Sequence, residues 1–234
     1  MEIKKKLFPT ILCSLLASAA LLAPASGQGQ RPQYPDLIPW EGSGRNYFVE
    51  QVNGRKLLRF SAGMINVGDG DLTVTGKAGK KKSRLKAVQK IKKQGTSRRI
   101  NRPVGEFVYN RDKRKWDVLT LAEYRLLDAS GSQVMATTKI SFCTVDVMLA
   151  RPQMQGVNFN GKYRSCPAGR KQKKITVGLS IGWADIYSEN RDGQAIDVTT
   201  LPSGNYTLEI EINPGGILLE SDMDNNTLRL PVTI

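Results

Sequence analysis

Short runs of alternating apolar and polar residues follow one another along most of the chain. In the clearest run, positions 206, 208, 210 and 212 are apolar and the residues between them are polar, as in a strand with one buried face. Turn-forming residues separate the runs, and Asn53-Gly54 is typical of a two-residue hairpin turn. The pattern predicts strands at 47–52, 56–60, 64–67, 72–75, 119–127, 137–145, 175–177, 206–212 and 228–234.

Beyond residue 27, no helical period is sustained. The predicted fold is therefore an all-β sandwich with long irregular loops. Trp40 and Trp183 are interpreted as packing residues of the core or of a loop. Asp69 and Asp71 lie in a glycine-rich turn, and turn chemistry explains them better than calcium because the other ligands of a calcium loop are absent.

The first 27 residues have the pattern of a cleaved signal peptide. Three lysines, Lys4 to Lys6, precede an apolar run from Leu7 to Ala23, and small residues follow up to Gly27. The alternative is a retained membrane anchor, but the run is shorter than the ~20 residues of a span and contains Pro9. Residues 28–234 are predicted to form one domain with no membrane span, in a protein that is secreted or periplasmic/extracellular.

The chain has three cysteines and no histidine. The missing imidazole excludes a Ser-His-Asp triad, a histidine general base and histidine-bound zinc, copper or non-haem iron. Three cysteines are too few for a four-thiolate zinc site, and Cys13 lies in the signal segment. A disulfide is predicted between Cys143 and Cys166, because an export compartment is oxidising. Two separately buried thiols are the alternative.

The formal net charge of +14 is very unevenly distributed. Residues 77–102 carry 12 basic side chains and no acidic one, so the rest of the chain after the signal segment is neutral. Such a block is either a solvated arm or an anion-binding surface. We predict a mobile basic ribbon, since the partial helical spacing of Leu85, Val88 and Ile91 is weak.

This basic segment contains no aromatic residue, so stacking on bases is not indicated. For an exported protein, the expected partner is an anionic polymer, either a cell-surface polysaccharide or extracellular nucleic acid. The candidate anion-binding residues are Lys80, Lys81, Lys82, Arg84, Lys86, Lys90, Lys92, Lys93, Arg98 and Arg99.

Ten short sequence blocks occur in an order that resembles the catalytic domain of the lysyl oxidases, from about residue 35 to the C-terminus. No single block is specific, but the ordered series indicates a common fold. The blocks include Pro35-Asp36-Leu37, Leu57-Leu58-Arg59-Phe60, Tyr124-Arg125-Leu126-Leu127-Asp128, Lys139-Ile140-Ser141-Phe142-Cys143, Asp185-Ile186-Tyr187 and Pro202-Ser203-Gly204-Asn205-Tyr206.

The resemblance implies a secreted copper amine oxidase that converts peptidyl lysine amines to aldehydes. The family cofactor, lysine tyrosylquinone, forms by copper-dependent oxidation of a tyrosine and its cross-linking to a lysine. By position these residues are Tyr187 and Lys139. Asp185 matches the carboxylate proposed as the base that removes the substrate α-proton.

The metal site of the family has no counterpart in this sequence. The positions of its His-x-His-x-His run fall on Asp112, Arg114 and Trp116. Arginine and tryptophan side chains have no lone pair for copper, and a carboxylate is a poor match for it. Neither copper nor the quinone is therefore expected here. Lys139, Asp185 and Tyr187 are interpreted as inherited structure.

Three hypotheses follow for the function. The first is an inactive, secreted lysyl oxidase-like protein that binds an anionic polymer through its basic segment. The second is a protein-lysine 6-oxidase with an unconventional metal site. The third is a structural envelope component with no specific ligand. Bound copper and a quinone absorbance distinguish the second from the others, and salt-sensitive polymer binding distinguishes the first from the third.

Overall fold

A computed structural model describes residues 30–77, 83–112, 114–118, 121–139, 143–170, 172 and 174–234. The predicted signal segment 1–27 lies outside these ranges, as do Lys80, Lys81 and Lys82. In the described part of the chain every regular element is a strand except one short 3-10 helix, η1 (Pro214–Gly216). The all-β prediction is confirmed, and no helix in these ranges is long enough to cross a membrane.

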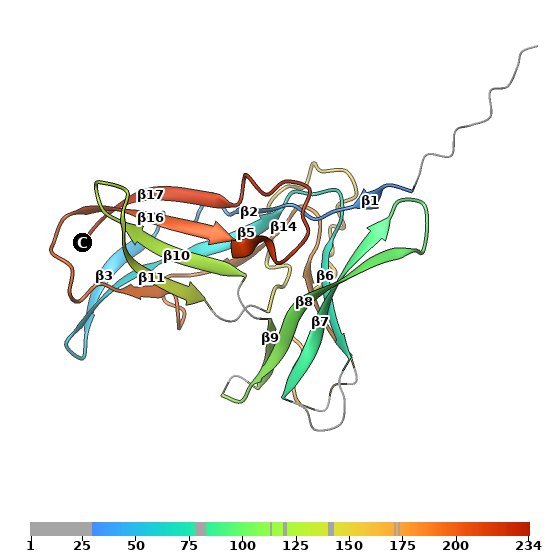
Figure 1. The fold of residues 1–234 in the computed structure, drawn as a ribbon, viewed down its shortest axis with the longest axis horizontal. Coiled ribbons are helices and arrows are strands. Elements are labelled where there is room, and N and C mark those ends of the chain that lie inside the picture. The colour runs from blue at the N-terminus through green and yellow to red at the C-terminus, as the bar shows by residue number, and fades with distance from the viewer. Residues whose placement is uncertain are drawn as a thin grey trace, which may run out of the picture.

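The strands form four antiparallel sheets, shown in Figure 1. The largest sheet has the order β13 (Lys174–Leu179), β6 (Leu72–Lys77), β7 (Arg84–Lys93), β8 (Arg99–Asn110) and β9 (Lys115–Val118), and β1 (Pro32–Gln33) also pairs with β7. In Figure 1, β7 and β8 run across the direction of β10, β16 and β17.

The other three sheets are smaller. One has the order β11 (Gln133–Lys139), β10 (Ala122–Leu127), β16 (Asn205–Ile212) and β17 (Thr227–Thr233). The next has the order β12 (Met148–Leu149), β14 (Trp183–Tyr187), β5 (Ala62–Asn66) and β2 (Leu37–Pro39). The last consists of β15 (Ala195–Asp197), β4 (Arg55–Phe60) and β3 (Tyr47–Val52).

One continuous apolar core joins the four sheets. Phe60 of β4, Met64 of β5, Phe107 of β8, Tyr124 of β10 and Ile210 of β16 all belong to it, and each is almost fully buried. Burial of large side chains of this kind stabilises the fold by roughly 1.5–3 kcal/mol each. The core therefore fixes how the sheets meet, and with it the site described below.

The predicted hairpin at 47–60 is present as β3 and β4. Its turn residues Asn53 and Gly54 have φ angles of 51° and 74°. Positive φ at both central positions is what a type I′ turn requires, and glycine adopts it without strain. Local turn chemistry therefore determined this hairpin.

One predicted strand is shifted in the structure, and two others do not form the strand–turn–strand unit that their spacing suggests. The strand expected at 137–145 is shifted, because β11 ends at Lys139 and residues 143–147 form no strand. The strands at 64–67 and 72–75 exist, but they do not pair with each other. Instead, β5 pairs with β2 and β14, while β6 pairs with β7 and β13. Each strand therefore pairs with other strands of the fold instead of forming a hairpin across the turn between them.

The prediction of a mobile basic ribbon at 77–102 is wrong in the described part of this segment. Residues 84–93 and 99–110 form the long β7–β8 hairpin. Leu85, Ala87, Gln89 and Ile91 point into the protein, whereas the residues between them are exposed or half-buried. This period of two is that of a strand with one buried face. The basic side chains are thus held on a sheet.

Candidate functional site

Asp185 and Tyr187 lie two residues apart on β14, so their side chains share one face of the strand. Both are buried, with exposed fractions of 1% and 8%. The Tyr187 hydroxyl donates a hydrogen bond of 2.7 Å to Asp185 Oδ2. The pair that the resemblance identified is therefore assembled as a buried phenol–carboxylate contact.

A second buried tyrosine lies beside this pair. The Tyr124 hydroxyl of β10 donates to Gln194 Oε1 at 3.3 Å, and Gln194 Nε2 donates to the Phe60 carbonyl at 3.3 Å. The Phe60 and Tyr124 rings pack edge to face with centroids 5.0 Å apart. Sequence analysis missed Tyr124 and Gln194 as members of this group, because only long-range packing brings them to β14.

Burial determines the protonation of both phenols. It raises the pKa of Tyr187 well above the usual value, and the neighbouring Asp185 carboxylate raises that pKa further. Burial likewise raises the pKa of Tyr124. Both hydroxyls are therefore protonated donors near neutral pH. The Arg191 guanidinium stacks over the Tyr187 ring, 5.3 Å from its centroid.

Lys139, the lysine that the resemblance pairs with Tyr187, is the last residue of β11. Its backbone pairs in register with Ala122 of β10. Tyr124 lies two residues further along β10, opposite Thr137. The Lys139 side chain is outside the described part of the structure, so its contact with Tyr187 stays a prediction from the resemblance.

Of the three positions that the resemblance assigns to copper ligands, two lie in the turn between β8 and β9, and the third lies in β9 itself. Asp112 and Arg114 are exposed, and Arg114 has a φ of 51°. Trp116, by contrast, is fully buried. Its indole N–H donates to the Gly169 carbonyl at 3.1 Å, and its ring packs 5.3 Å from that of Tyr109. The third of these positions is thus occupied by a core residue.

These residues do not fit a copper ion. The indole nitrogen of Trp116 carries its proton toward Gly169 and offers no lone pair, and a guanidinium has none either. Among the described residues, no group of three or more cysteine, aspartate or glutamate side chains gathers in a metal-binding arrangement. Since copper favours imidazole or sulfur donors, no catalytic step through copper follows from this site.

The predicted disulfide between Cys143 and Cys166 is confirmed, with a Cα–Cα distance of 5.7 Å. The residues that follow Cys166 contact the strand that carries Trp116. The Pro167 carbonyl accepts the Trp116 backbone N–H at 3.2 Å, and the Arg114 carbonyl accepts the Gly169 N–H at 3.0 Å. The disulfide therefore anchors the loop that closes over Trp116.

The β7–β8 hairpin presents most of the predicted anion-binding residues. Arg84, Lys86 and Lys92 are exposed on β7, where Lys90 is half-buried, and Arg99 is exposed on β8. Arg84 pairs with Glu106 at 2.9 Å. Within the described ranges, no carboxylate lies at ion-pair distance from the following candidates: Lys86, Lys90, Lys92, Lys93, Arg98 and Arg99.

Asp69 and Asp71, which were interpreted as turn residues, each contact a cation. Asp69 pairs with Arg31 at 3.2 Å. Asp71 pairs with Lys162 and also accepts the Ile181 backbone N–H at 3.3 Å. Their carboxylates thus tie distant segments together, which turn chemistry alone does not predict.

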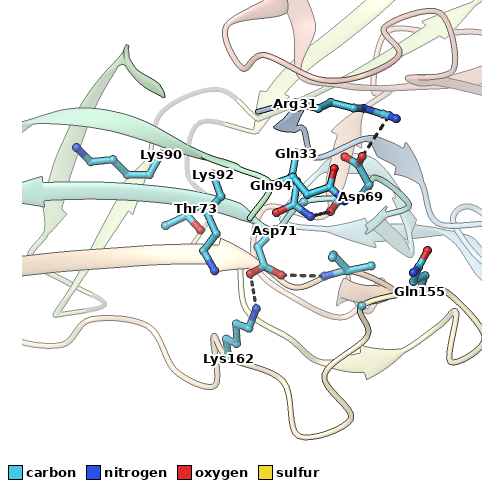
Figure 2. A pocket seen from close by; sticks show the side chains of 13 residues that line it. Arg31, Gln33, Asp69, Asp71, Thr73, Lys90, Lys92, Gln94, Gln155 and Lys162 are labelled. Carbon is cyan, nitrogen blue, oxygen red and sulfur yellow. Dashed lines mark hydrogen bonds and ion pairs between the residues drawn. The ribbon is translucent and has the colours of Figure 1, made fainter. Parts of the chain in front are cut away.

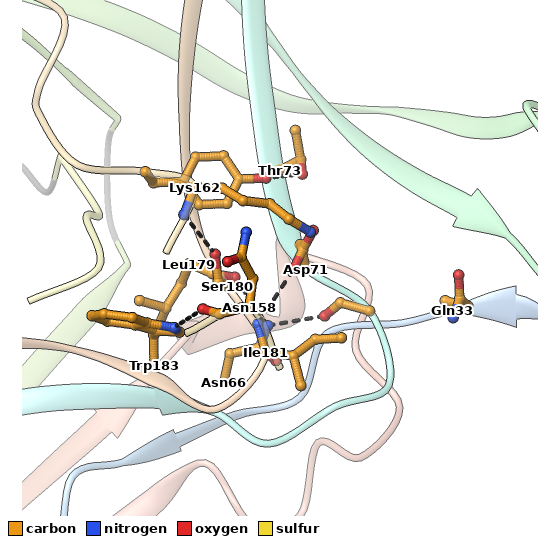
Figure 3. A network of polar contacts seen from close by, with 12 residues as sticks. Gln33, Asn66, Asp71, Thr73, Asn158, Lys162, Leu179, Ser180, Ile181 and Trp183 are labelled. Carbon is orange, nitrogen blue, oxygen red and sulfur yellow. Dashed lines mark hydrogen bonds and ion pairs between the residues drawn. The ribbon is translucent and has the colours of Figure 1, made fainter. Parts of the chain in front are cut away.

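Trp183 is half-buried, and its indole N–H donates to the Asn158 carbonyl at 2.9 Å (Figure 3). Trp40 is half-buried as well, next to Gly42. Both tryptophans therefore pack against loops.

Comparison with known proteins gives a consistent family match. Residues 73–233 match the family model for lysyl oxidase. Protein-lysine 6-oxidase of Rattus norvegicus is 28% identical over 242 residues, which cover 89% of this chain and 51% of that protein. Lysyl oxidase homolog 1 of Homo sapiens is 33% identical over 160 residues, which cover 62% of this chain and 24% of that protein. This chain thus spans about half the length of the first relative and about a quarter of the second.

Proposed function

Because the chain belongs to the lysyl oxidase family, we propose that it is a secreted, catalytically inactive lysyl oxidase-like protein that binds an anionic polymer. The polymer is extracellular or lies on the cell surface. The observation that carries the binding role is the basic face of the β7–β8 hairpin, where Lys86, Lys92 and Arg99 are exposed and have no carboxylate at ion-pair distance among the described residues. Secretion rests on the signal-peptide pattern of residues 1–27.

An ordered strand is a better anion-binding surface than a mobile arm. Residues two apart on one face of a strand are spaced by about 6.6 Å, so Lys90 and Lys92 present their charges at a fixed repeat. Across the ladder, Lys92 lies directly opposite Arg99. Like charges in such a pair repel each other, and a polymer with regularly spaced anions relieves this repulsion.

Inactivity rests on Trp116. Quinone formation in the family depends on copper, and this residue stands where the family has a ligand. Trp116 is fully buried and its N–H is engaged with Gly169. We therefore expect Tyr187 and Lys139 to stay unmodified. The observation that favours the alternative, an amine oxidase with an unconventional metal site, is the Tyr187–Asp185 hydrogen bond, since the family's tyrosine and base still meet.

A salt titration tests the binding role. For duplex DNA, the logarithm of the affinity should fall with the logarithm of the salt concentration with a slope of about −0.9 per phosphate contacted, and an acidic polysaccharide should show a similar trend. Changing Lys86, Lys90 and Lys92 to glutamine should reduce both the affinity and the slope. The matched control changes Arg45, Lys56 and Lys174, which lie away from the hairpin face and outside the cavity described below, to glutamine. Salt-independent binding, or equal losses in both variants, contradicts the proposed surface.

The proposed inactivity has its own test. The chain without residues 1–27 is expressed with excess copper, and its metal content, visible absorbance and peroxide release with lysine-containing peptides are measured. Mass spectrometry searches for a peptide cross-linked between Lys139 and Tyr187. We expect none of these signals above background. Stoichiometric copper together with the cross-link would contradict the proposed inactivity and support the alternative function, an amine oxidase. N-terminal sequencing of exported protein tests cleavage near residue 27.

A further inference from the structure

A polar cavity of about 470 Å³ lies beside the basic hairpin (Figure 2). Most of its lining comes from four segments distant in sequence, namely residues 31–33, residues 69–73, the end of β7 with Gln94 and the loop at 155–162, and Ile181 completes it. Its volume is within the range of about 300–1,000 Å³ that is usual for small-molecule sites. Figure 2 shows Lys92 pointing from β7 toward the side of the cavity that holds Asp71 and Lys162.

The charges of the lining leave two ammonium groups available. Four cations line the cavity, and two of them already have a carboxylate partner: Arg31 pairs with Asp69, and Lys162 pairs with Asp71. The other two are Lys90 and Lys92. Within the described residues neither has a carboxylate at ion-pair distance, although Lys90 donates to Asn101 Oδ1 at 2.8 Å. The lining therefore carries two ammonium groups without a carboxylate partner, and Lys92 is the one that Figure 2 shows directed toward Asp71 and Lys162.

Neutral hydrogen-bonding groups make up much of the remaining lining. The side chains of Gln33, Gln94 and Gln155 contribute amides, and Thr73 contributes a hydroxyl. Amides both donate and accept hydrogen bonds, as sugar hydroxyls also do. None of the described residues that line the cavity is aromatic, so a base would have no ring on which to stack. This lining favours a sugar over a nucleotide.

The wall of the cavity is held by buried polar contacts, shown in Figure 3. Asn66 Nδ2 donates to the carbonyls of Gly70 and Leu179 at 2.9 and 3.0 Å. The Lys162 backbone N–H donates to Ser180 Oγ at 3.2 Å. At Gly70, an added Cβ would lie 2.1 Å from the Gln33 carbonyl oxygen, so β1 approaches this turn closely because the residue is glycine. The site is therefore preorganised.

We propose that this cavity binds one acidic sugar unit of a polysaccharide. Lys90 and Lys92 bind its carboxylate or sulfate, and the glutamine amides bind its hydroxyls. The proposal rests on the proposed function and deepens it, because it selects an acidic polysaccharide instead of nucleic acid as the polymer.

Isothermal titration of the protein lacking residues 1–27 tests the proposal with four probes. A tetragalacturonate supplies carboxylates and a sulfated maltotetraose supplies sulfates, whereas neutral maltotetraose and a 12-base-pair DNA duplex are the comparisons. We expect at least one of the two acidic tetrasaccharides to bind, and which one binds shows whether the site prefers a carboxylate or a sulfate. Neutral maltotetraose should bind at least about tenfold more weakly than that acidic tetrasaccharide.

Two double variants remove the same charge from different places. Changing Lys90 and Lys92 to glutamine should weaken the acidic sugar at least about tenfold, because each ammonium makes a charge-assisted hydrogen bond. Lys86 and Arg98 lie outside the cavity lining. Changing both to glutamine should weaken binding of the acidic sugar less than about threefold. Gln94→Ala should weaken the sugar about three- to tenfold without changing its salt slope.

The outcomes separate this inference from the proposed function. Equal losses of sugar affinity in the two double variants, or no effect of Gln94→Ala, overturn the cavity as the site while polymer binding by the hairpin stands. DNA binding that falls as much as sugar binding in the Lys90/Lys92 variant assigns the cavity to nucleic acid and overturns the sugar proposal. If no anionic probe binds even at low salt, the proposed function itself fails. Circular dichroism and the melting temperature confirm that each variant is folded.

Discussion

The buried polar group around Tyr187 and the basic face of β7 differ in how their charges are satisfied. Around Tyr187, each hydroxyl has an internal partner: Asp185 accepts from Tyr187, and Gln194 accepts from Tyr124. On β7, Lys86 and Lys92 are exposed, and the described residues bring no carboxylate to either. The polar groups of the first region are paired within the protein, whereas the second region leaves exposed ammonium groups without a carboxylate among the described residues.

This difference indicates where an interaction with another molecule is feasible. A peptidyl lysine would have to reach a tyrosine that is only 8% exposed and lies under the Arg191 guanidinium. The basic face requires no such rearrangement. Under the proposed function, Asp185 and Tyr187 are structural contacts, and the exposed cations that would bind a partner lie on a different sheet. Four measurements test this contrast.

The largest effect is expected at Trp116, the buried residue at a copper-ligand position. Trp116→Ala removes a fully buried indole and leaves the Gly169 carbonyl without its donor. We expect a loss of about 3–5 kcal/mol in the free energy of unfolding. Urea denaturation monitored by circular dichroism measures it.

Trp116→Phe is the matched control, because it keeps a ring and removes the N–H. It should cost about 1–2 kcal/mol. Trp116→His should also be destabilising, because the smaller imidazole does not fill the space of the buried indole. A single imidazole at this position should not bind copper. A stable Trp116→His variant that binds copper would show that the position is still open to a metal.

The second effect concerns Glu220, a buried carboxyl that connects the C-terminal loop to β2. It accepts hydrogen bonds from the Leu37 backbone N–H and from the side-chain amides of Asn213 and Asn226. Burial raises its pKa from 4.5 to about 7, although these hydrogen bonds oppose the rise. The folded state therefore favours the protonated form.

The sign of the pH dependence follows from this pKa. Between about pH 4.5 and 7 the folded protein binds more protons than the unfolded chain, so stability should fall as the pH rises through this range, by about 3 kcal/mol. The chain has no histidine to titrate there. Urea unfolding at pH 4.5 and 8 should show the loss in the native protein and a much flatter profile in Glu220→Gln. The exposed Asp192→Asn control should retain the native profile.

Sequence analysis predicted the fold best where one local rule was sufficient. The alternation at 206–212 corresponds to β16, and Asn53-Gly54 forms the expected turn. The basic hairpin was not predicted, because two of the buried positions of β7 are the small Ala87 and the polar Gln89, which weaken the alternation of apolar and polar residues. Gln89 is buried only because its amide pairs with the Leu219 backbone, with two hydrogen bonds of 2.9 Å. That partner is 130 residues away.

The same reasoning applies to the sites. The spacing of Asp185 and Tyr187 places them on one strand face, so their contact is a local consequence of the sequence. The contact of Tyr124 with Gln194 depends on how β10 packs against the chain after β14. Most of the cavity lining comes from four segments that no short pattern connects. Properties that depend on tertiary packing were therefore the ones that the sequence alone did not predict.

A smaller effect is expected for Tyr187→Phe. The substitution removes the hydroxyl that donates to the buried Asp185 carboxylate at 2.7 Å. Loss of one donor to a buried charge should lower the free energy of unfolding by about 1–3 kcal/mol. The control is Tyr206→Phe, whose exposed hydroxyl donates to the Pro202 carbonyl at 2.9 Å and should matter by less than about 1 kcal/mol. If Tyr187→Phe is neutral or stabilising, the group is not a structural contact.

The smallest effect distinguishes two cross-strand pairs that share the same geometry. Lys92 and Arg99 lie directly opposite each other in the β7–β8 ladder, whereas Glu209 and Arg229 lie directly opposite each other in the β16–β17 ladder. The second pair is joined by a hydrogen bond of 2.7 Å. Arg99→Gln removes a repulsion and Arg229→Gln removes an attraction, although both delete one exposed guanidinium.

We expect Arg99→Gln to raise, and Arg229→Gln to lower, the free energy of unfolding by about 0.2–1 kcal/mol each at low salt. The charges of Lys92 and Arg99 are exposed, so the Arg99→Gln difference should shrink in 1 M salt, where the Debye length is about 3 Å. The Arg229→Gln difference should persist in part, because Glu209 is only 4% exposed. Urea unfolding of the three proteins at low and high salt measures this. If Arg99→Gln is destabilising instead, the arginine has a structural role. That result would contradict the repulsion between Lys92 and Arg99 that an external anion is proposed to relieve.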